Sequence, residues 1–241
     1  MEALVGCVVL VAAGVALGLA ASGSGAEAAR PASGVSTASL ATAQTPTTAP
    51  TTTQTQEATG PPPGTVLFRD RFSRDDGYWD LDEGPVHLHV RGGAYHLVAR
   101  NAPYDTVTPR DMQPAPSAAV DFRVRGRPSG RVGVGLGVGN EQEFDAVVNP
   151  ASGKFTLRAW HGDVADDLRM GVSRAGAGAG WKRVRLECLV TESGTRLTLR
   201  VNGRVVARAL AERAAGPLST LDVIVGPAAD AVLDDVVVRA L

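Results

Sequence analysis

Apolar and polar residues alternate with a period of two through residues 65–241, and this alternation constrains the fold more than any other feature of the sequence. No long stretch shows the period of an amphipathic helix, and only residues 209–215 leave room for a turn or two of helix. The strand at residues 132–139 has glycine at every second position, so one face is bare and lets a ligand or another backbone approach closely. The pattern predicts an all-β unit, an antiparallel β-sandwich. We expect strands at residues 86–91, 95–99, 118–125, 132–139, 143–149, 154–160, 181–191, 195–201, 204–208, 219–225 and 231–239.

Two dipeptides indicate how neighbouring strands pair. Asn202-Gly203 separates two alternating segments, and both residue types tolerate the positive φ angles of a type I′ hairpin turn. Gly92-Gly93 holds the same position between two other expected strands. A two-residue turn at Gly92-Gly93 places His89 opposite His96 and gathers the apolar residues of both strands on one face.

Composition divides the chain into three parts. Residues 1–21 contain a long uncharged run of Leu, Val, Ala and Gly, which fits either a transmembrane anchor or a signal peptide. Residues 22–64 are rich in Thr, Ala and Pro and have little apolar surface to bury, which predicts a disordered linker. Residues 65–241 are the expected folded domain. Both interpretations of the N-terminal run place that domain outside the cytoplasm, either membrane-anchored or secreted.

Charge and cysteine content exclude several classes of function. The chain has 24 Lys+Arg and 25 Asp+Glu, a net charge of −1, which argues against a nucleic-acid partner. Its 2 cysteines are too few for a disulfide scaffold or a multi-thiolate metal site. Cys188 lies within an apolar strand pattern and is expected to be a buried, inert thiol. The glycines at residues 176–180 lack the Lys-Ser/Thr that a phosphate-binding loop needs.

The order of several short motifs resembles concanavalin A-like jelly-roll domains, in particular laminin-G-like lectin modules and bacterial 3-keto-disaccharide hydrolases. The resemblance covers nearly all of residues 65–241 and implies a jelly roll that acts on or binds carbohydrate. The matching segments are Leu67-Phe68-Arg69-Asp70-Arg71-Phe72 with Trp79, Phe144 to Asn149 with Phe155-Thr156-Leu157, Trp181 to Leu186, the Asn202-Gly203 hairpin, and Leu233 to Val238.

The resemblance also implies where catalytic carboxylates would lie. Jelly-roll glycanases carry Glu-x-Asp-x-x-Glu on one strand, with one carboxylate as nucleophile and another as acid. Here Glu143 and Asp145 match the first two positions, and Val148 replaces the third carboxylate. Glu141 shares the face of Glu143 and Asp145 in a regular strand. Without the third carboxylate, a solvated strand face is the preferred interpretation and no catalytic residue is assigned.

Two metal sites are candidates. His87, His89 and His96 meet on one face if the Gly92-Gly93 turn has two residues, and three imidazoles can bind zinc with an open position. Asp70 and Asp235 belong to the first and last strands, which jelly rolls bring together, and carboxylates of this kind can bind calcium. The alternative for both groups is a polar surface without a metal.

Aromatic side chains are the candidate ligand contacts because sugar rings stack on them. Trp160 is out of phase with the apolar residues of its strand, so it is expected on the opposite face, beside His161. Tyr104 and Trp79 are further candidates. Trp181 is also out of phase with its strand and is expected to plug an edge of the sandwich.

These observations favour a non-catalytic, exported module that binds a glycan or another cell-envelope component at the cell surface. A carbohydrate-active hydrolase of the 3-keto-disaccharide type is one alternative. A sensor or scaffold ectodomain that binds protein is another. Apart from the possible calcium or zinc, no cofactor is expected.

Overall fold

All regular secondary structure in the described part of the chain is β-strand. The structure, a computed structural model, describes residues 60–74, 78–100, 106–127, 130–138, 142–212 and 216–241. The strands are β1 (Val66–Asp70), β2 (Leu81–Glu83), β3 (Val86–Arg91), β4 (Ala94–Ala99), β5 (Thr106–Ala115), β6 (Ala118–Gly126), β7 (Val132–Val138), β8 (Gln142–Val148), β9 (Ser152–His161), β10 (Val164–Ala177), β11 (Lys182–Thr191), β12 (Gly194–Val201), β13 (Arg204–Ala211), β14 (Leu218–Val225) and β15 (Asp230–Ala240).

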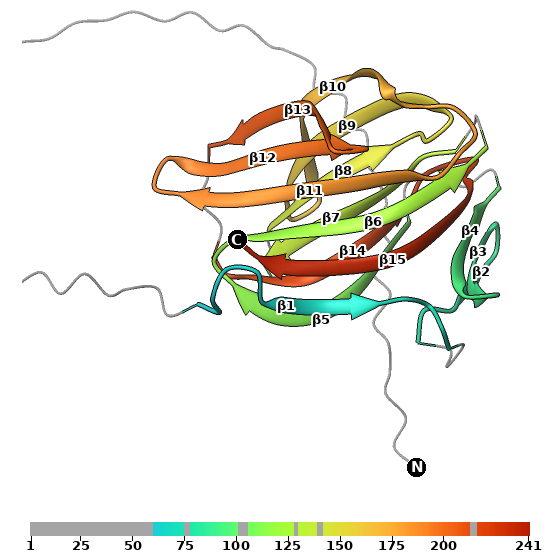
Figure 1. The fold of residues 1–241 in the computed structure, drawn as a ribbon, viewed down its shortest axis with the longest axis horizontal. Helices are drawn as coiled ribbons and strands as arrows, with labels where there is room; N and C mark the ends of the chain where they lie inside the picture. The colour runs from blue at the N-terminus through green and yellow to red at the C-terminus, as the bar shows by residue number, and fades with distance from the viewer. Residues whose placement is uncertain (1–59, 75–77, 101–105, 128–129, 139–141, 213–215) are drawn as a thin grey trace, which may run out of the picture. The chain divides into compact units, whose positions relative to one another are not determined.

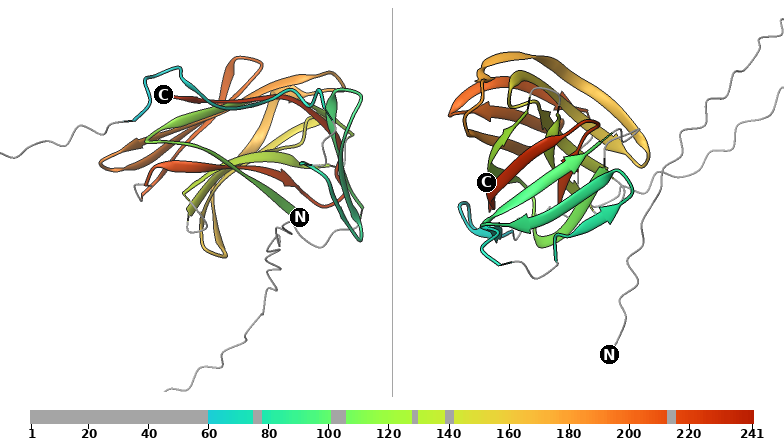
Figure 2. Two further views of the ribbon diagram at one scale, coloured as in Figure 1. Left: turned by 90° about the horizontal axis from the view of Figure 1, so that it is seen from below. Right: turned by 90° about the vertical axis from the view of Figure 1, so that its right-hand side faces the viewer.

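The strands form two antiparallel sheets that pack face to face (Figures 1 and 2). Sheet A has nine strands in the order β13-β12-β11-β6-β15-β4-β3-β2, and β1 also pairs with β15. Sheet B has six strands in the order β10-β9-β8-β7-β14-β5. Neighbours in space are often distant in sequence, as with β6 and β15 or β7 and β14. The predicted antiparallel β-sandwich is therefore confirmed.

The core lies between the sheets and is made by the apolar half of each alternating strand. Sheet A contributes Phe122, Leu186 and Leu199, and sheet B contributes Leu136 and Phe144, all at most 2% exposed. Cys188 is also fully buried, and burial raises the pKa of its thiol, so the expected inert cysteine is confirmed.

Both predicted two-residue turns are present. Asn202 and Gly203 have φ angles of 50° and 77°, and Val201 pairs with Arg204 across them. Gly92 and Gly93 have φ angles of 61° and 76°. These positive φ angles fit a type I′ turn and account for the residue types found there.

Three strands, β2, β5 and β10, were not expected from the sequence. β2 is an outer strand of sheet A, and β5 and β10 are the outer strands of sheet B, so each pairs on one side only. Most side chains of β10 are exposed, which removes the alternation that marks a half-buried strand. β5 contains Pro109 and Pro114, which are compatible with an edge strand and disfavour a central one. The helical turn considered at residues 209–215 is wrong in its described part, because β13 continues to Ala211.

The N-terminal segment expected to be an anchor or signal peptide, and nearly all of the expected linker, lie outside the described residues. Within the described ranges, no helix has the length and apolar character needed to cross a membrane.

Candidate functional site

A compact group of polar side chains occupies the middle of the outer face of sheet B. Strand pairing aligns two rows across β14, β7, β8 and β9, with neighbouring strands roughly 4.8 Å apart. The first row is Asp222, Gly135, Asp145 and Arg158, and the second is Thr220, Gly137, Glu143 and Trp160. We call these two rows the carboxylate site.

Asp145 is the fixed charge at the centre of the carboxylate site. Its side chain is 0% exposed, and that of its neighbour Arg158 is 11% exposed. Nε of Arg158 donates to both carboxylate oxygens of Asp145, at 2.9 and 3.0 Å, and Nη2 lies 2.8 Å from Oδ2. The indole N–H of Trp160 donates to Oδ2 at 2.7 Å, and the Arg158 guanidinium lies 5.1 Å from the centre of the Trp160 ring. Asp145 therefore holds both Arg158 and Trp160 in position.

Glu143 and Asp222 are carboxyl groups that favour their protonated forms. Burial raises the pKa of Asp222 to about 7, and the charge of Asp145 adds to the effect. Burial also raises the pKa of Glu143 well above its ordinary value, with further contributions from Asp222 and Asp145 that outweigh the opposing charge of Arg158. Near neutral pH the site therefore combines a buried ion pair with carboxyl groups that can donate as well as accept hydrogen bonds.

Side chains of β8 fold over the bare glycine face of β7. A Cβ atom at Gly135 would overlap the Glu143 carboxyl group, and one at Gly133 would lie 2.6 Å from the Ala146 carbonyl oxygen. The close approach expected at this glycine face is therefore made by β8 itself. Because Gly135 has no side chain, the Glu143 carboxyl group can lie over it, in the space between strands β8 and β14.

Two oxygens in the second row lack partners. Glu143 Oε1 and Thr220 Oγ1 are buried, and neither has a hydrogen-bond partner among the described residues. They lie on strands that flank Gly137, in the same row as the half-buried Trp160. Buried polar atoms without partners are uncommon and cost free energy. The two oxygens are therefore unsatisfied hydrogen-bond acceptors within the carboxylate site.

A cavity of about 360 Å³ adjoins the carboxylate site. Val147 and Thr156 form part of its lining, and each lies two residues along its strand from the Asp145–Arg158 row. Arg131 and Lys154 also line it and give it basic groups. The cavity therefore lies beside the carboxylate site along the direction of the strands.

The residues that were predicted to contact a ligand do not share one face of the structure. Trp160 lies on the outer face of sheet B, opposite in phase to Leu157 and Ala159, as expected. His161 is half-buried at the end of β9, and its position in the strand directs it away from the face of Trp160. Tyr104 lies outside the described residues.

The role of ligand contact suggested for Trp79 is wrong, because its side chain is 1% exposed and belongs to the core. Its ring lies 5.5 Å from that of Phe72 and 5.3 Å from that of Tyr95. Its indole N–H donates to Oδ2 of Asp70 at 2.7 Å. Sequence alone does not distinguish a core aromatic residue at this position from an exposed one that could stack on a sugar.

The predicted zinc triad is wrong, although the strand register behind it is correct. His89 pairs with His96, and their rings stack with centres 5.5 Å apart. His87 instead lies with Nδ1 2.5 Å from a carboxylate oxygen of Asp82. Among the described side chains, no three His, Cys, Asp or Glu residues come together as a metal site.

The two residues of the predicted calcium pair lie on neighbouring strands. β1 does lie beside β15, and Asp70 pairs with Val236, next to Asp235. The Asp70 carboxylate, however, accepts hydrogen bonds from Trp79 and from the backbone N–H of Phe72, at 2.7 and 2.6 Å. Asp235 is exposed, with a φ angle of 53°, at an irregularity in β15.

Comparison with known proteins identifies the architecture. No family model matches the chain, and no curated protein matches it. Among solved structures, a Bacillus subtilis protein of unknown function with a galectin-like fold matches with a TM-score of 0.55 and 14% identity, over 74% of this chain and 97% of that one. A prokaryotic β-1,3-1,4-glucanase (lichenase) from a mouse hindgut metagenome matches with a TM-score of 0.50 and 10% identity, over 73% and 99%. The fold is a concanavalin A-like jelly roll.

A third match shows that this jelly roll also occurs within a larger protein. A sialidase aligns with a TM-score of 0.52 and 10% identity, over 74% of this chain but 19% of that one. At such identities the similarity shows the jelly roll and nothing about the ligand or activity. The expected resemblance to concanavalin A-like domains is confirmed at this level.

Asp222, Thr220 and Arg158 are site residues that sequence reasoning missed. The strand motif led to Glu143 and Asp145 and ended at Val148, whereas Asp222 reaches the same site from β14, on the far side of β7. One signal was present in the sequence. Asp222 interrupts the apolar run from Leu221 to Val225, at a position facing away from the core.

Proposed function

We propose that the chain is a cell-surface module that binds carbohydrate, without turnover, at the carboxylate site. The observation that carries this proposal is the second row, where unpartnered Glu143 Oε1 and Thr220 Oγ1 share a face with Trp160. Sugars present hydroxyl groups in the plane of the ring and an apolar face of C–H groups. The row offers partners for both, because polar oxygens satisfy hydroxyls and an indole ring packs against the apolar face.

Two further features support a glycan larger than one sugar. The Val147–Thr156 row and the cavity beside it lie next to the Asp145–Arg158 row, so contacts continue along the strands. Successive rows on one face of a strand are roughly 7 Å apart, so this surface is long enough for a short oligosaccharide.

Replacing Trp160 tests this proposal. We expect Trp160→Ala to weaken glycan binding at least about tenfold, because the stacking surface is lost. The indole N–H also donates to Asp145, so Trp160→Ala removes a hydrogen bond as well. Trp160→Phe is the matched control, since it loses the hydrogen bond and keeps an aromatic ring. A glycan array with the purified chain identifies the ligand, and titration calorimetry then measures both variants.

Stacking predicts that Trp160→Phe retains most of the affinity that Trp160→Ala loses. Equal binding by wild type and Trp160→Ala would exclude the carboxylate site as the glycan site. Capture of a stable protein partner from envelope extracts, with no glycan bound on the array, would favour the scaffold interpretation.

Hydrolysis of a glycan is the second candidate, and the raised pKa of Asp222 and of Glu143 favours it. A carboxyl group that stays protonated near neutral pH beside an ionised one is the arrangement used for general acid catalysis. Release of reducing ends from the bound glycan, abolished by Glu143→Gln, would establish this candidate. Stable binding with no release supports the non-catalytic module.

We further propose that the chain is exported. Residues 1–21 then act either as a transmembrane anchor or as a signal peptide. The uncharged run at residues 3–21 and the Thr-rich, Pro-rich residues that follow support this placement. We expect a C-terminal reporter that is active only outside the cytoplasm to be active. A reporter protein that functions only in the cytoplasm should give no signal. The reverse pattern would overturn the placement.

A further inference from the structure

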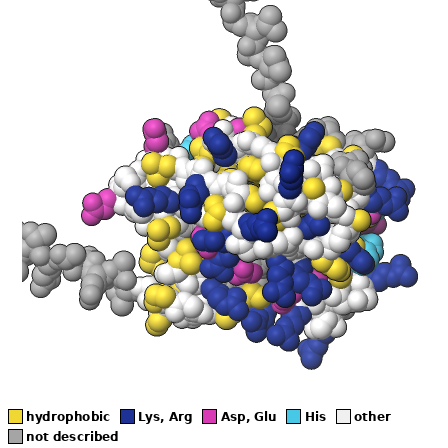
Figure 3. Space-filling view, turned by 45° about the horizontal axis from the view of Figure 1, so that its top comes forward, with side chains coloured by type: hydrophobic (Ala, Val, Ile, Leu, Met, Phe, Trp, Pro, Cys, Tyr) yellow, Lys and Arg dark blue, Asp and Glu magenta, His cyan; other side chains and the backbone are white. Residues whose placement is uncertain are grey.

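A second polar surface lies on the opposite side of the molecule, on the outer face of sheet A. Arg123 on β6 pairs with Arg183 on β11, and Arg185 on β11 pairs with Arg200 on β12. Arg239 on β15 lies in the adjoining part of the same face, opposite Ala119. Like charges directly opposite each other on a sheet are destabilising. We call this surface the arginine face; basic side chains gather over a broad region in Figure 3, with fewer acidic ones between them.

Carboxylates on the arginine face are already bound by its guanidinium groups. Arg185 donates to Asp121 at 2.6 Å and to Glu187 at 2.8 Å. Arg200 shares the same Glu187 oxygen at 3.2 Å. Arg123 donates to Asp234 at 2.6 Å. These acidic residues are fewer than the arginines around them, so the face keeps an excess of positive charge.

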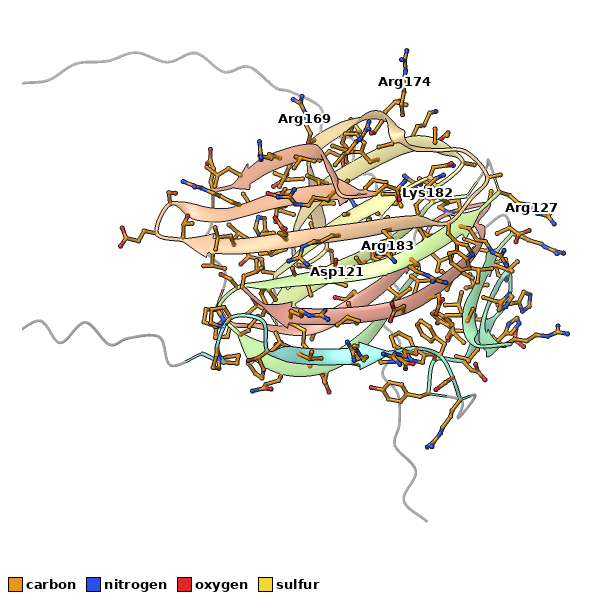
Figure 4. All side chains as sticks on the ribbon, in the orientation of Figure 1. Asp121, Arg127, Arg169, Arg174, Lys182 and Arg183 are labelled. Carbon is orange, nitrogen blue, oxygen red and sulfur yellow. The ribbon has the colours of Figure 1, made fainter. Side chains whose placement is uncertain are left out.

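The excess is concentrated at one end of the arginine face, around Trp181. This side chain is 36% exposed. The guanidinium of Arg123 lies 4.9 Å from the ring centre and that of Arg125 lies 4.8 Å from it. Arg125 and Arg183 are exposed, and Figure 4 shows Arg183 and Asp121 on this face of the sheet. Packing against the ring preorganises the cations, which lowers the entropy lost on binding an anion.

We propose that the arginine face binds an acidic polysaccharide that carries carboxylate groups. Charge complementarity supports this ligand. The basic residues that define the arginine face are arginines, and the planar guanidinium group matches a carboxylate. Two arginines of this face, Arg185 and Arg123, already bind carboxylates of the protein itself. The surface is the face of a sheet, with side chains spaced regularly by strand geometry, and it suits an extended chain of repeating charges.

Polygalacturonate is a suitable probe for this site. We expect the Arg125→Ser/Arg183→Ser variant of the full chain to bind it at least about tenfold more weakly than wild type at low salt, since both exposed cations are lost. Binding by wild type should also weaken as salt is added. The matched control is Arg169→Ser/Arg174→Ser, which removes two exposed arginines from β10 of sheet B, labelled in Figure 4.

The control distinguishes a local site from a general effect of net charge. Equal loss in both double variants, or no binding of polygalacturonate by wild type, overturns the proposal. Comparable binding of a DNA duplex or of vesicles with anionic headgroups also overturns it, because the site would then not select carboxylated polysaccharide. Trp160→Ala should leave polygalacturonate binding unchanged, so failure at the carboxylate site and failure at the arginine face are separable.

Discussion

Replacing Arg158 with glutamine is expected to lower the free energy of unfolding by about 3–5 kcal/mol, the usual cost of leaving a buried charge without its partner. Asp145 has no access to solvent, and Arg158 supplies three of its short contacts. Glutamine cannot neutralise the carboxylate, and water cannot reach it without opening the site. Chemical denaturation of both proteins measures the difference.

Two controls separate a buried charge from a lost hydrogen bond. Asp145→Asn/Arg158→Gln buries neither charge, so it should recover much of the stability lost in Arg158→Gln. Arg127→Gln removes an arginine from an exposed pair, in which Arg127 Nε lies 3.0 Å from Asp230 and the arginine side chain is 77% exposed. That change should cost less than about 1 kcal/mol. Similar losses for Arg158→Gln and Arg127→Gln would show that Asp145 is not desolvated.

The contribution of Asp222 to stability is expected to fall as the pH rises from about 4 to about 7. The pKa of Asp222 is raised from 3.8 to about 7, so between these values the folded protein retains a proton that the unfolded chain has lost. The contribution of Asp222 is therefore favourable below about pH 4 and is lost as the pH rises to about 7 and above. The shift corresponds to roughly 4 kcal/mol. The raised pKa of Glu143 acts in the same direction.

Asp222→Asn removes this titration while preserving the shape of the side chain. We expect the variant to be more stable than wild type at pH 8, and the difference to shrink as the pH falls towards 4. Asp235→Asn is the matched control because Asp235 is exposed, and it should follow wild type at every pH. Thermal unfolding across this pH range measures all three proteins. Parallel curves for wild type and Asp222→Asn would contradict the raised pKa.

The sheet architecture was predictable because most strands have one buried face. Segments such as Ala118–Gly126 and Lys182–Thr191 carry the alternation that core packing imposes, and Asn202-Gly203 fixes a turn chemically. β10 has almost no buried face, and so nothing in its sequence imposed a period of two. The predicted strands are those in which burial against the core selects an apolar side chain at every second residue.

The carboxylate site was only half predictable, because it depends on which strands become neighbours. Glu143 and Asp145 share a strand, so a local motif could find them. Asp222 joins them through the pairing of β14 with β7, and about eighty residues separate it from Asp145. The Asp145–Arg158 ion pair could have been predicted, because the Gly153 turn sets the register between β8 and β9 and so places the two residues opposite each other.

β1 enters the jelly roll beside the C-terminal end of the chain, and this arrangement has a mechanical consequence. Gly64 donates its backbone N–H to the carbonyl oxygen of Ala240 at 2.9 Å, and β15 is the strand with which β1 pairs. A pull on the N-terminal segment therefore loads the hydrogen bonds between β1 and β15 first. Because β1 pairs with a single strand, it should detach before the rest of sheet A yields. Single-molecule stretching would register this as a short extension preceding the main rupture.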